Sequence, residues 1–259
     1  MCIRDRRDLA RALFGARRLH VMFLPPEDPS LETLRAAARG RAIVRTLERS
    51  PYVAIEGDWE SYERGLDQHL VKELRRRRRR LDEQGVVEVE VRDGTHDLEA
   101  LLDEGFRVEA AGWKGEQKTA IASEPATRRF YTEVARWGVE RGELRLVFLR
   151  VDGRAIAFNY AWEAQGVHYL LKTGLDPEYA RYAPGKLIVE AMIKRAHDHG
   201  FTMYDFLGDT MPWKLEWTDR VRELKLLQAF APTAAGLADW AAWSFGRPLA
   251  KRALALARR

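Results

Sequence analysis

The sequence predicts an α+β fold in which a mixed sheet is flanked by helices. The first observation is an antiparallel meander of three apolar segments separated by Gly-containing turns, at Glu143–Asp152, Arg154–Glu163 and Val167–Thr173. The second is a helical repeat of apolar residues over 181–199, which ends at Gly200 and precedes a short strand, Met203–Phe206. A meander that leads into a strand–helix–strand unit is typical of α+β proteins.

The composition is that of a globular protein, since hydrophobic residues make up 46% and charged residues 32% of the 259 positions. Cys2 is the one cysteine, so no disulfide can form within the chain, which fits a reducing compartment. No apolar run approaches the ~20 residues of a membrane span. We therefore expect the protein in the cytoplasm or at the inner face of the membrane, and its net charge of +5 favours anionic partners.

The N-terminal part gives strand and helix signals that lack an obvious complete set of partners. Strands are predicted over Leu19–Leu24 and Arg41–Leu47, with a helix over Ser30–Ala38 between them. We expect Leu19–Leu24 to lie at the edge of a sheet or to expose apolar surface.

Helical and strand patterns alternate through the rest of the chain. Apolar residues recur at helical spacing over Asp58–Gln84, which predicts one long helix, and alternate with acidic residues in a half-buried strand, Val86–Val91. Helices over Asp97–Ala111 and Ala126–Arg141 precede the meander, and a strand over Val221–Phe230 follows it. The segment 233–259 is predicted to be a basic amphipathic helical tail. It could lie on an anionic membrane surface or pack on the body of the protein.

The helix that begins at Pro184-Gly185 has no Ser, Thr, Asp or Asn at its expected cap position. Its first backbone N–H groups therefore lack an obvious side-chain partner. Such groups, together with the helix dipole, suit a phosphate, which points to a nucleotide-type cofactor. The alternative is an ordinary crossover helix.

Ten short motifs, spread in order from Ser50 to Trp217, resemble those of one family of proteins. They are SPYV (50–53), GDWESY (57–62), LRRRRRRL (74–81), WKG (113–115), TAI (119–121), RFY (129–131), LKTGLDPEY (171–179), PGKL (184–187), YDFLGD (204–209) and WKLEW (213–217). The set resembles the CelD-related acetyltransferase-like proteins, a branch of the GNAT superfamily close to the FemABX transferases.

The resemblance implies a GNAT-like fold and the transfer of an acyl group from a CoA thioester, or a related donor, to an amine or hydroxyl. The family suggests a glycan acceptor, such as a polysaccharide or cell-envelope precursor. It also implies that residues 1–56 are the remnant of a first GNAT-like module whose start is missing, and that residues 57–232 form the acyltransferase domain.

The pyrophosphate loop of GNAT proteins reads Q/R-x-x-G-x-G/A, and this chain keeps one of its glycines. The aligned residues predicted to bind the cofactor are Tyr182, Pro184, Gly185, Lys186 and Leu187. Two alternatives therefore stay open. One is a FemABX-like transferase that uses aminoacyl-tRNA, and the other is a catalytically inactive binding module.

The run Arg75–Arg80 covers the whole circumference of a helix, so it cannot form one binding face. Arg77 is the arginine that falls within the apolar stripe from Trp59 to Leu81, and we expect it to be less exposed than its neighbours. Its partner is either Glu73, four residues earlier, or a bound ligand.

Acyl transfer needs a base for the acceptor and a group that polarises the thioester carbonyl. Asp205, in a short apolar strand, is the candidate base, and Lys172 is expected close to it at the mouth of a cleft. The candidate substrate-binding residues are Arg77, Trp113, Lys114, Asp176, Tyr179 and Lys214. No metal is predicted, because His197 and His199 do not share a helix face.

Overall fold

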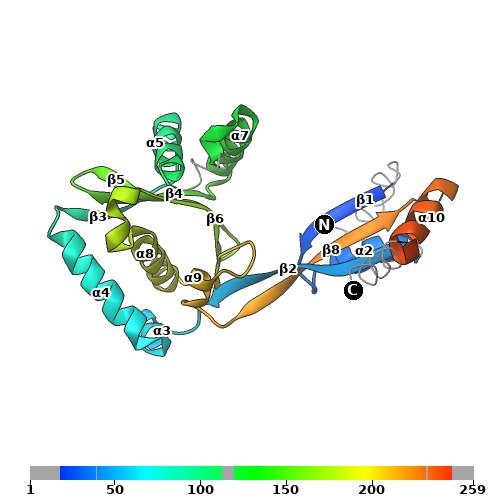
Figure 1. The fold of residues 1–259 in the computed structure, drawn as a ribbon, viewed down its shortest axis with the longest axis horizontal. Helices are drawn as coiled ribbons and strands as arrows, with labels where there is room; N and C mark the ends of the chain where they lie inside the picture. Colours follow the sequence, from blue (N-terminus) through cyan, green and yellow to red (C-terminus); the bar gives the residue numbers. More distant parts are fainter. Residues whose placement is uncertain (1–17, 39, 113–119, 232, 247–259) are drawn as a thin grey trace, which may run out of the picture. The chain divides into compact units, whose positions relative to one another are not determined.

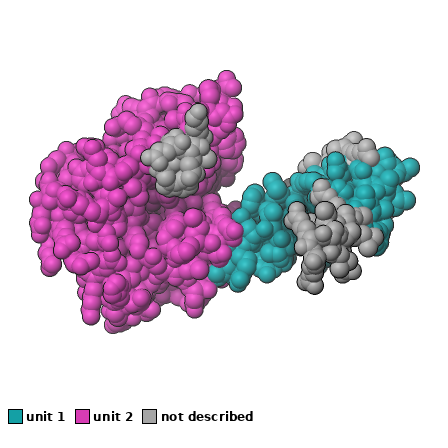
Figure 2. Space-filling view, viewed as in Figure 1, with its two compact units in different colours: residues 1–50, 221–259 teal, residues 51–220 magenta. Residues whose placement is uncertain are grey.

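The computed structural model describes residues 18–38, 40–112, 120–231 and 233–246. The chain divides into two compact units, residues 1–50 with 221–259 and residues 51–220, which are coloured separately in Figure 2. This division differs from the predicted boundaries at 56 and 232, because the strand over 221–230 belongs to unit 1. Its residues pair with those of an N-terminal strand, from Arg18↔Phe230 to Leu24↔Lys225.

Unit 1 is a small layer of strands covered by a short helix. Its described elements are β1 (Arg18–Leu24), α2 (Pro29–Ala37), the first part of β2 (Ala42–Ala54), β8 (Val221–Phe230), α10 (Ala234–Ala241) and a π-helical turn over Ala242–Gly246. Strand β1 is the outer strand beside β8, and Met22 and Phe23 on it are each 53% exposed. The edge position predicted for Leu19–Leu24 is confirmed. Residues 247–259 of the predicted basic tail lie outside the described residues.

Unit 2 contains the end of β2 and the meander. Its other elements are α3 (Trp59–Gly65), α4 (Gln68–Asp82), β3 (Val87–Arg92), α5 (Leu98–Ala110), η1 (Ile121–Ser123), α7 (Pro125–Arg141), β4 (Leu144–Val151), β5 (Arg154–Ala164), β6 (Val167–Leu175), η2 (Pro177–Tyr182), α8 (Pro184–Asp198), β7 (Met203–Asp205) and α9 (Pro212–Leu215). The strand order is β2-β7-β6-β5-β4-β3. The pair β6–β7 is parallel and the other described pairs are antiparallel, so the predicted mixed sheet is confirmed.

Two apolar cores hold the helices of unit 2 on opposite faces of the sheet (Figure 1). On one face, Leu74 and Leu81 of α4 pack with Ile188 and Met192 of α8. On the other face, α5 and α7 contribute Phe106 and other residues to a second core. Burial of each large side chain contributes about 1.5–3 kcal/mol.

The predicted single helix over Asp58–Gln84 is wrong, because the structure has two helices there. Leu66 is extended, and the side chain of Asp67 accepts a hydrogen bond from the His69 N–H at 2.8 Å. An aspartate in this position caps a new helix, so a polar residue interrupts a helical apolar pattern that otherwise continues. The break brings α3 and α4 around the cavity described below.

Candidate functional site

Strands β6 and β7 pair over three residues and then separate. Val167, His168 and Tyr169 of β6 lie opposite Met203, Tyr204 and Asp205 of β7. Strand β7 then ends, whereas β6 continues to Leu175 beside β5. Since parallel strands end at the same edge of a sheet, this edge lies at the carboxyl ends of both strands, where ligands of open α/β sheets bind.

A β-bulge lies just beyond the separation point. Tyr160 of β5 pairs with Lys172, but its neighbour Ala161 pairs with Leu170, so Leu171 is the extra residue on β6. A bulge turns backbone groups out of the regular ladder and is common beside active sites. The backbone of Leu171 is therefore a candidate to polarise a carbonyl group placed between the strands.

Helix α8 begins at the same edge of the sheet. Its cap residue, Ala183, has a φ of 50° and no side-chain hydrogen bond caps the helix, as the sequence predicts. Lys186 and Leu187 donate their N–H groups to the Ala183 carbonyl, and Pro184 has no N–H. Within the described part of the chain, the Gly185 N–H has no backbone acceptor, so it is the donor that α8 offers to an anion.

The structure narrows the predicted cofactor-binding set. Tyr182 is 6% exposed and Leu187 is 2% exposed, and both side chains belong to the core under α8. Pro184 is also buried. Their side chains pack inward, so a contact of these three residues with a cofactor would come from the backbone, and their assignment to a cofactor stays a prediction. Gly185 and Lys186 are partly exposed.

Three residues predicted to bind substrate make contacts that hold the loop before α8. The guanidinium of Arg77 donates to the Arg181 carbonyl at 2.7 Å and to Glu73 at 2.8 Å. Asp176 caps η2 through the Glu178 N–H and pairs with Arg154 at 2.6 Å. The Arg154 guanidinium also lies over the Tyr179 ring, with its Cζ 5.5 Å from the ring centre. These contacts give Arg77, Asp176 and Tyr179 a positioning role.

The expected burial of Arg77 is confirmed, because it is half-buried whereas Arg76 and Arg79 are exposed. Arg78 is half-buried as well and pairs with Asp82, so Arg77 is not alone in the run in leaving the exposed surface. The Glu73 partner that the sequence offered is the one observed.

Replacing Arg77 with alanine should lower the free energy of unfolding by about 1 kcal/mol, because its charged hydrogen bonds to Glu73 and to the Arg181 carbonyl are lost. Arg79→Ala, in the same run but exposed, should change it by less than about 0.5 kcal/mol. Urea titration of both variants measures the difference. Equal midpoints would show that the contact with the loop before α8 contributes nothing.

Asp205 is fully buried, and its Oδ1 accepts a hydrogen bond from the Leu207 N–H at 2.9 Å. Tyr169 of β6 pairs with Asp205, and Lys172 lies three residues further along β6, roughly 10 Å away. The Lys172 ammonium lies 5.3 Å from the centre of the Tyr131 ring. The approach of Lys172 to Asp205 stays a prediction. Trp113 and Lys114 lie outside the described residues.

Lys214 was predicted to contact substrate, but it is 6% exposed. Its ammonium donates to the Leu207 carbonyl at 2.5 Å and to the Asp209 carbonyl at 2.9 Å. Both carbonyls belong to the loop that leaves β7, where Leu207 and Gly208 have positive φ. A buried ammonium needs such acceptors, so Lys214 shapes this loop and the prediction of direct substrate contact is not supported.

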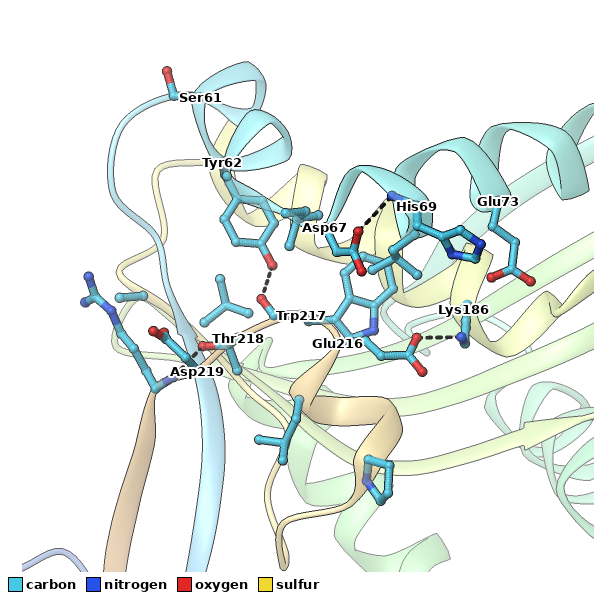
Figure 3. A pocket seen from close by; sticks show the side chains of 18 of the residues that line it. Ser61, Tyr62, Asp67, His69, Glu73, Lys186, Glu216, Trp217, Thr218 and Asp219 are labelled. Atoms are coloured by element: carbon cyan, nitrogen blue, oxygen red, sulfur yellow. Dashed lines mark hydrogen bonds and ion pairs between the residues drawn. The ribbon is translucent and has the colours of Figure 1, made fainter.

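A cavity of about 1030 Å³ lies on the face of the sheet that carries α4 and α8. It is walled by α3, α4, the start of α8 and the segment from α9 to Arg220, and we call it the α3–α4 cavity (Figure 3). The Tyr62 hydroxyl donates to the Trp217 carbonyl at 2.7 Å and joins two of its walls. Lys186, at the start of α8, faces the cavity and pairs with Glu216 at 2.5 Å.

Acidic side chains outnumber basic ones around the α3–α4 cavity. Arg220 and Lys186 are its Lys or Arg residues, whereas five carboxylates line it, from Glu56, Asp67, Glu73, Glu216 and Asp219. Glu56 pairs with Arg220 at 2.8 Å, so these two residues add no net charge to the cavity wall. Tyr62, Trp217 and Asp219 were not among the residues predicted to bind substrate, although the first two lie in the motifs GDWESY and WKLEW.

A smaller cavity of about 370 Å³ lies near the opposite end of α8, and we call it the arginine cavity. It is lined by Val91, Arg92, Asp93, Gly142, Arg145 and Arg195. Behind it, the buried carboxylate of Glu163 forms an ion pair with Arg145 at 2.7 Å and accepts hydrogen bonds from Arg195 and from His168, the latter at 3.1 Å. Burial alone would raise the pKa of Glu163, but the His168 hydrogen bond and the two guanidiniums outweigh it and hold the pKa below its ordinary value.

Stability should fall as the pH drops below about 6.5, the ordinary pKa of histidine. Burial lowers the pKa of His168 in the folded state, so the unfolded chain binds a proton that the folded chain does not take up. The loss is at most about 1.4 kcal/mol per pH unit for this one group. Urea midpoints at about pH 7.5 and about pH 5.5 measure it. His168→Phe keeps an aromatic ring against Tyr204, and its urea midpoint should fall less between the two pH values. An equal fall would show that other titrating groups cause the loss of stability.

Among the described residues, no group of three or more His, Cys, Asp and Glu side chains could hold a metal ion. No described helix is both long enough and apolar enough to cross a membrane.

Residues 68–215, more than half of the chain, match the protein family described as acetyltransferase (GNAT) domain. No curated protein matches the chain in sequence.

Several solved structures share the fold at low sequence identity. FemX superposes with a TM-score of 0.60 at 13% identity, over 87% of this chain and 75% of that one. The C-terminal domain of a putative lysylphosphatidylglycerol synthetase from Agrobacterium fabrum gives 0.59 at 14% identity, over 90% and 75%. L-PGS from Bacillus licheniformis gives 0.56 at 12% identity, over 83% and 68%. At these identities the comparison establishes a common fold.

Proposed function

The chain belongs to the acetyltransferase (GNAT) domain family, and from this premise we propose that unit 2 transfers an acyl group from acyl-CoA to an amine or hydroxyl acceptor. The observation that carries the proposal is the meeting of three features at one sheet edge. These are the separation of β6 from β7 after Tyr169, the bulge at Leu171 and the uncapped start of α8. Each supplies one of the contacts that a thioester donor needs.

The donor would lie along the gap between the two strands. Its pyrophosphate would accept from the Gly185 N–H at the positive end of the α8 dipole. Its thioester carbonyl would accept from backbone at the bulge, where negative charge develops as the acceptor attacks. In the transfer, the carbon–sulfur bond of the thioester breaks, the new bond to nitrogen or oxygen forms, and the acceptor's proton passes to a base while the thiolate is protonated. Asp205 is the candidate base.

The α3–α4 cavity favours an amine over a hydroxyl as the acceptor. Its five carboxylates face one lysine and one arginine, so it attracts cationic groups. A volume of about 1030 Å³ accommodates more than an isolated amine, and the half-buried ring of Tyr62 lies in its wall. An amine-bearing cell-envelope precursor or glycan fits this chemistry.

A second candidate is aminoacyl transfer from a charged tRNA. Its support is the exposure of Arg75, Arg76, Arg79 and Arg80 on α4, together with the common fold with FemX. A basic helix of this kind suits a phosphate backbone. Binding of tRNA should then weaken steeply as salt is raised.

Isothermal titration calorimetry with acetyl-CoA tests the proposal, followed by transfer of labelled acetyl to a panel of mono- and diamines. We expect saturable binding of acetyl-CoA and product with the amines. Binding of tRNA with no binding of acetyl-CoA would favour the second candidate. If neither donor binds, the protein is a catalytically inactive binding module. The ion pair between Lys186 and Glu216 would then be the structural reason.

A further inference from the structure

We propose that the arginine cavity is a second anion site, which binds a phosphate oxyanion as inorganic phosphate or as the phosphomonoester of a small molecule. The cavity lies within unit 2, and none of its lining residues lines the α3–α4 cavity. Arg195 follows Gly185 by ten positions on α8, so the two ends of the helix are separated by about 15 Å. The proposal is therefore independent of donor binding at the start of α8.

Three guanidiniums converge on the cavity from different elements. Arg92 ends β3, Arg145 lies near the start of β4, and Arg195 lies in the last turn of α8. Their side chains are 35%, 22% and 22% exposed, so each is partly withdrawn from water and still reachable from the cavity. Donors that approach from three directions match the oxygens of a tetrahedral oxyanion, whereas a carboxylate would use one planar fork.

The guanidiniums keep donors in reserve. Each carries five N–H groups. Arg145 holds Nε in an ion pair with Glu163 and donates from Nη1 to the Gly142 and Leu144 carbonyls, at 3.0 and 2.6 Å. Arg195 uses Nη1 for Glu163, and Arg92 uses Nη1 for Glu90. The Nη2 groups of all three residues have no protein acceptor in the described part of the chain, so they remain for a ligand.

Two carboxylates beside the cavity are each shared between two guanidiniums. Glu163 pairs with both Arg145 and Arg195, and Glu90 pairs with both Arg92 and Arg150. Asp93 is also engaged locally, since its carboxylate accepts from the Thr95 N–H at 3.0 Å and the Thr95 hydroxyl at 2.8 Å. Glu163 lies behind the arginines and fixes two of them, so the site is held in place before an anion arrives.

The test is calorimetry of the full chain with sodium phosphate, with sodium chloride at matched ionic strength as the reference and glycerol phosphate as a second arm. We expect saturable phosphate binding that weakens about tenfold or more in Arg195→Gln and in Arg92→Gln, because each loses charged hydrogen bonds to the oxyanion. Arg107→Gln, an exposed arginine elsewhere in unit 2, is the matched control and should bind as wild type. Tighter binding of inorganic phosphate than of glycerol phosphate would identify the free ion as the ligand, and the reverse a phosphomonoester.

Gly185→Asp separates this site from the proposed donor site, because it should leave phosphate binding intact. Arg92→Gln decides the matter if Arg195→Gln does not fold, since Glu90 keeps Arg150 as its partner. The proposal is overturned if phosphate gives no saturable heat beyond chloride. It is also overturned if both cavity variants bind like Arg107→Gln, or if Gly185→Asp alone abolishes phosphate binding.

Discussion

Replacing Gly185 with aspartate should weaken acetyl-CoA binding about 100-fold or more and leave the thermal midpoint within about 2 °C of wild type. The new carboxylate would stand where the pyrophosphate is proposed to bind, and two like charges a few ångströms apart repel by several kcal/mol near a protein surface. A Cβ at this position meets the Leu175 side chain at 3.5 Å, an ordinary contact, so the fold accommodates the substitution. An acidic residue in the first helical turn also interacts favourably with the helix dipole.

Gly185→Ala is the matched control, because it adds the same Cβ without charge and keeps the N–H. It should bind acetyl-CoA within a few-fold of wild type. Calorimetry gives the affinities and a thermal melt the midpoints. Wild-type affinity in Gly185→Asp would place the pyrophosphate elsewhere, and equal losses in both variants would point to shape rather than charge.

The strands of unit 2 could be predicted because each is marked by local chemistry. Asp152-Gly153 and Gln165-Gly166 supply the positive φ that tight hairpin turns require, and the structure has positive φ at all four. The uncapped start of α8 could also be predicted from local sequence, since the absence of a capping residue before Pro184 can be seen there. Asp67 shows the limit of this approach. The residues around it continue a helical apolar pattern, which predicts that the helix runs on. Asp67 caps α4 because the backbone of Leu66 is extended and ends α3.

The site residues were harder to predict because burial depends on how α8 packs on the sheet. Tyr182 and Leu187 align with a loop that binds phosphate, yet the core under α8 takes their side chains. The Glu163–His168 pair was missed although a signal existed. The two residues are opposite each other in the hairpin whose turn is Gln165-Gly166, so a cross-strand pair could have been inferred. Arg145 and Arg195 join that pair from distant elements, and no local pattern reveals this.

Replacing Asp205 with asparagine should lower turnover about 100-fold or more, with acetyl-CoA affinity kept, if Asp205 is the base. Asparagine has the same shape, and its side-chain oxygen can still accept the hydrogen bond that Leu207 donates at 2.9 Å. The turn after β7 should therefore persist, so a loss of turnover would report the missing carboxylate. Steady-state kinetics separates the two effects, since loss of a base lowers kcat while a distorted donor site raises KM.

Asp209→Asn, on the same loop, is the matched control. Its carboxylate is exposed and accepts from the Thr210 N–H at 2.9 Å, so its loss should leave turnover near wild type. The pH dependence of kcat/KM gives a second readout, because the acidic limb, on which a carboxylate base becomes protonated as the pH falls, should disappear in Asp205→Asn and remain in Asp209→Asn. If both variants turn over normally, the buried Asp205 carboxylate serves the turn that it caps. A water held at the separation of β6 and β7 would then be the better candidate for the base.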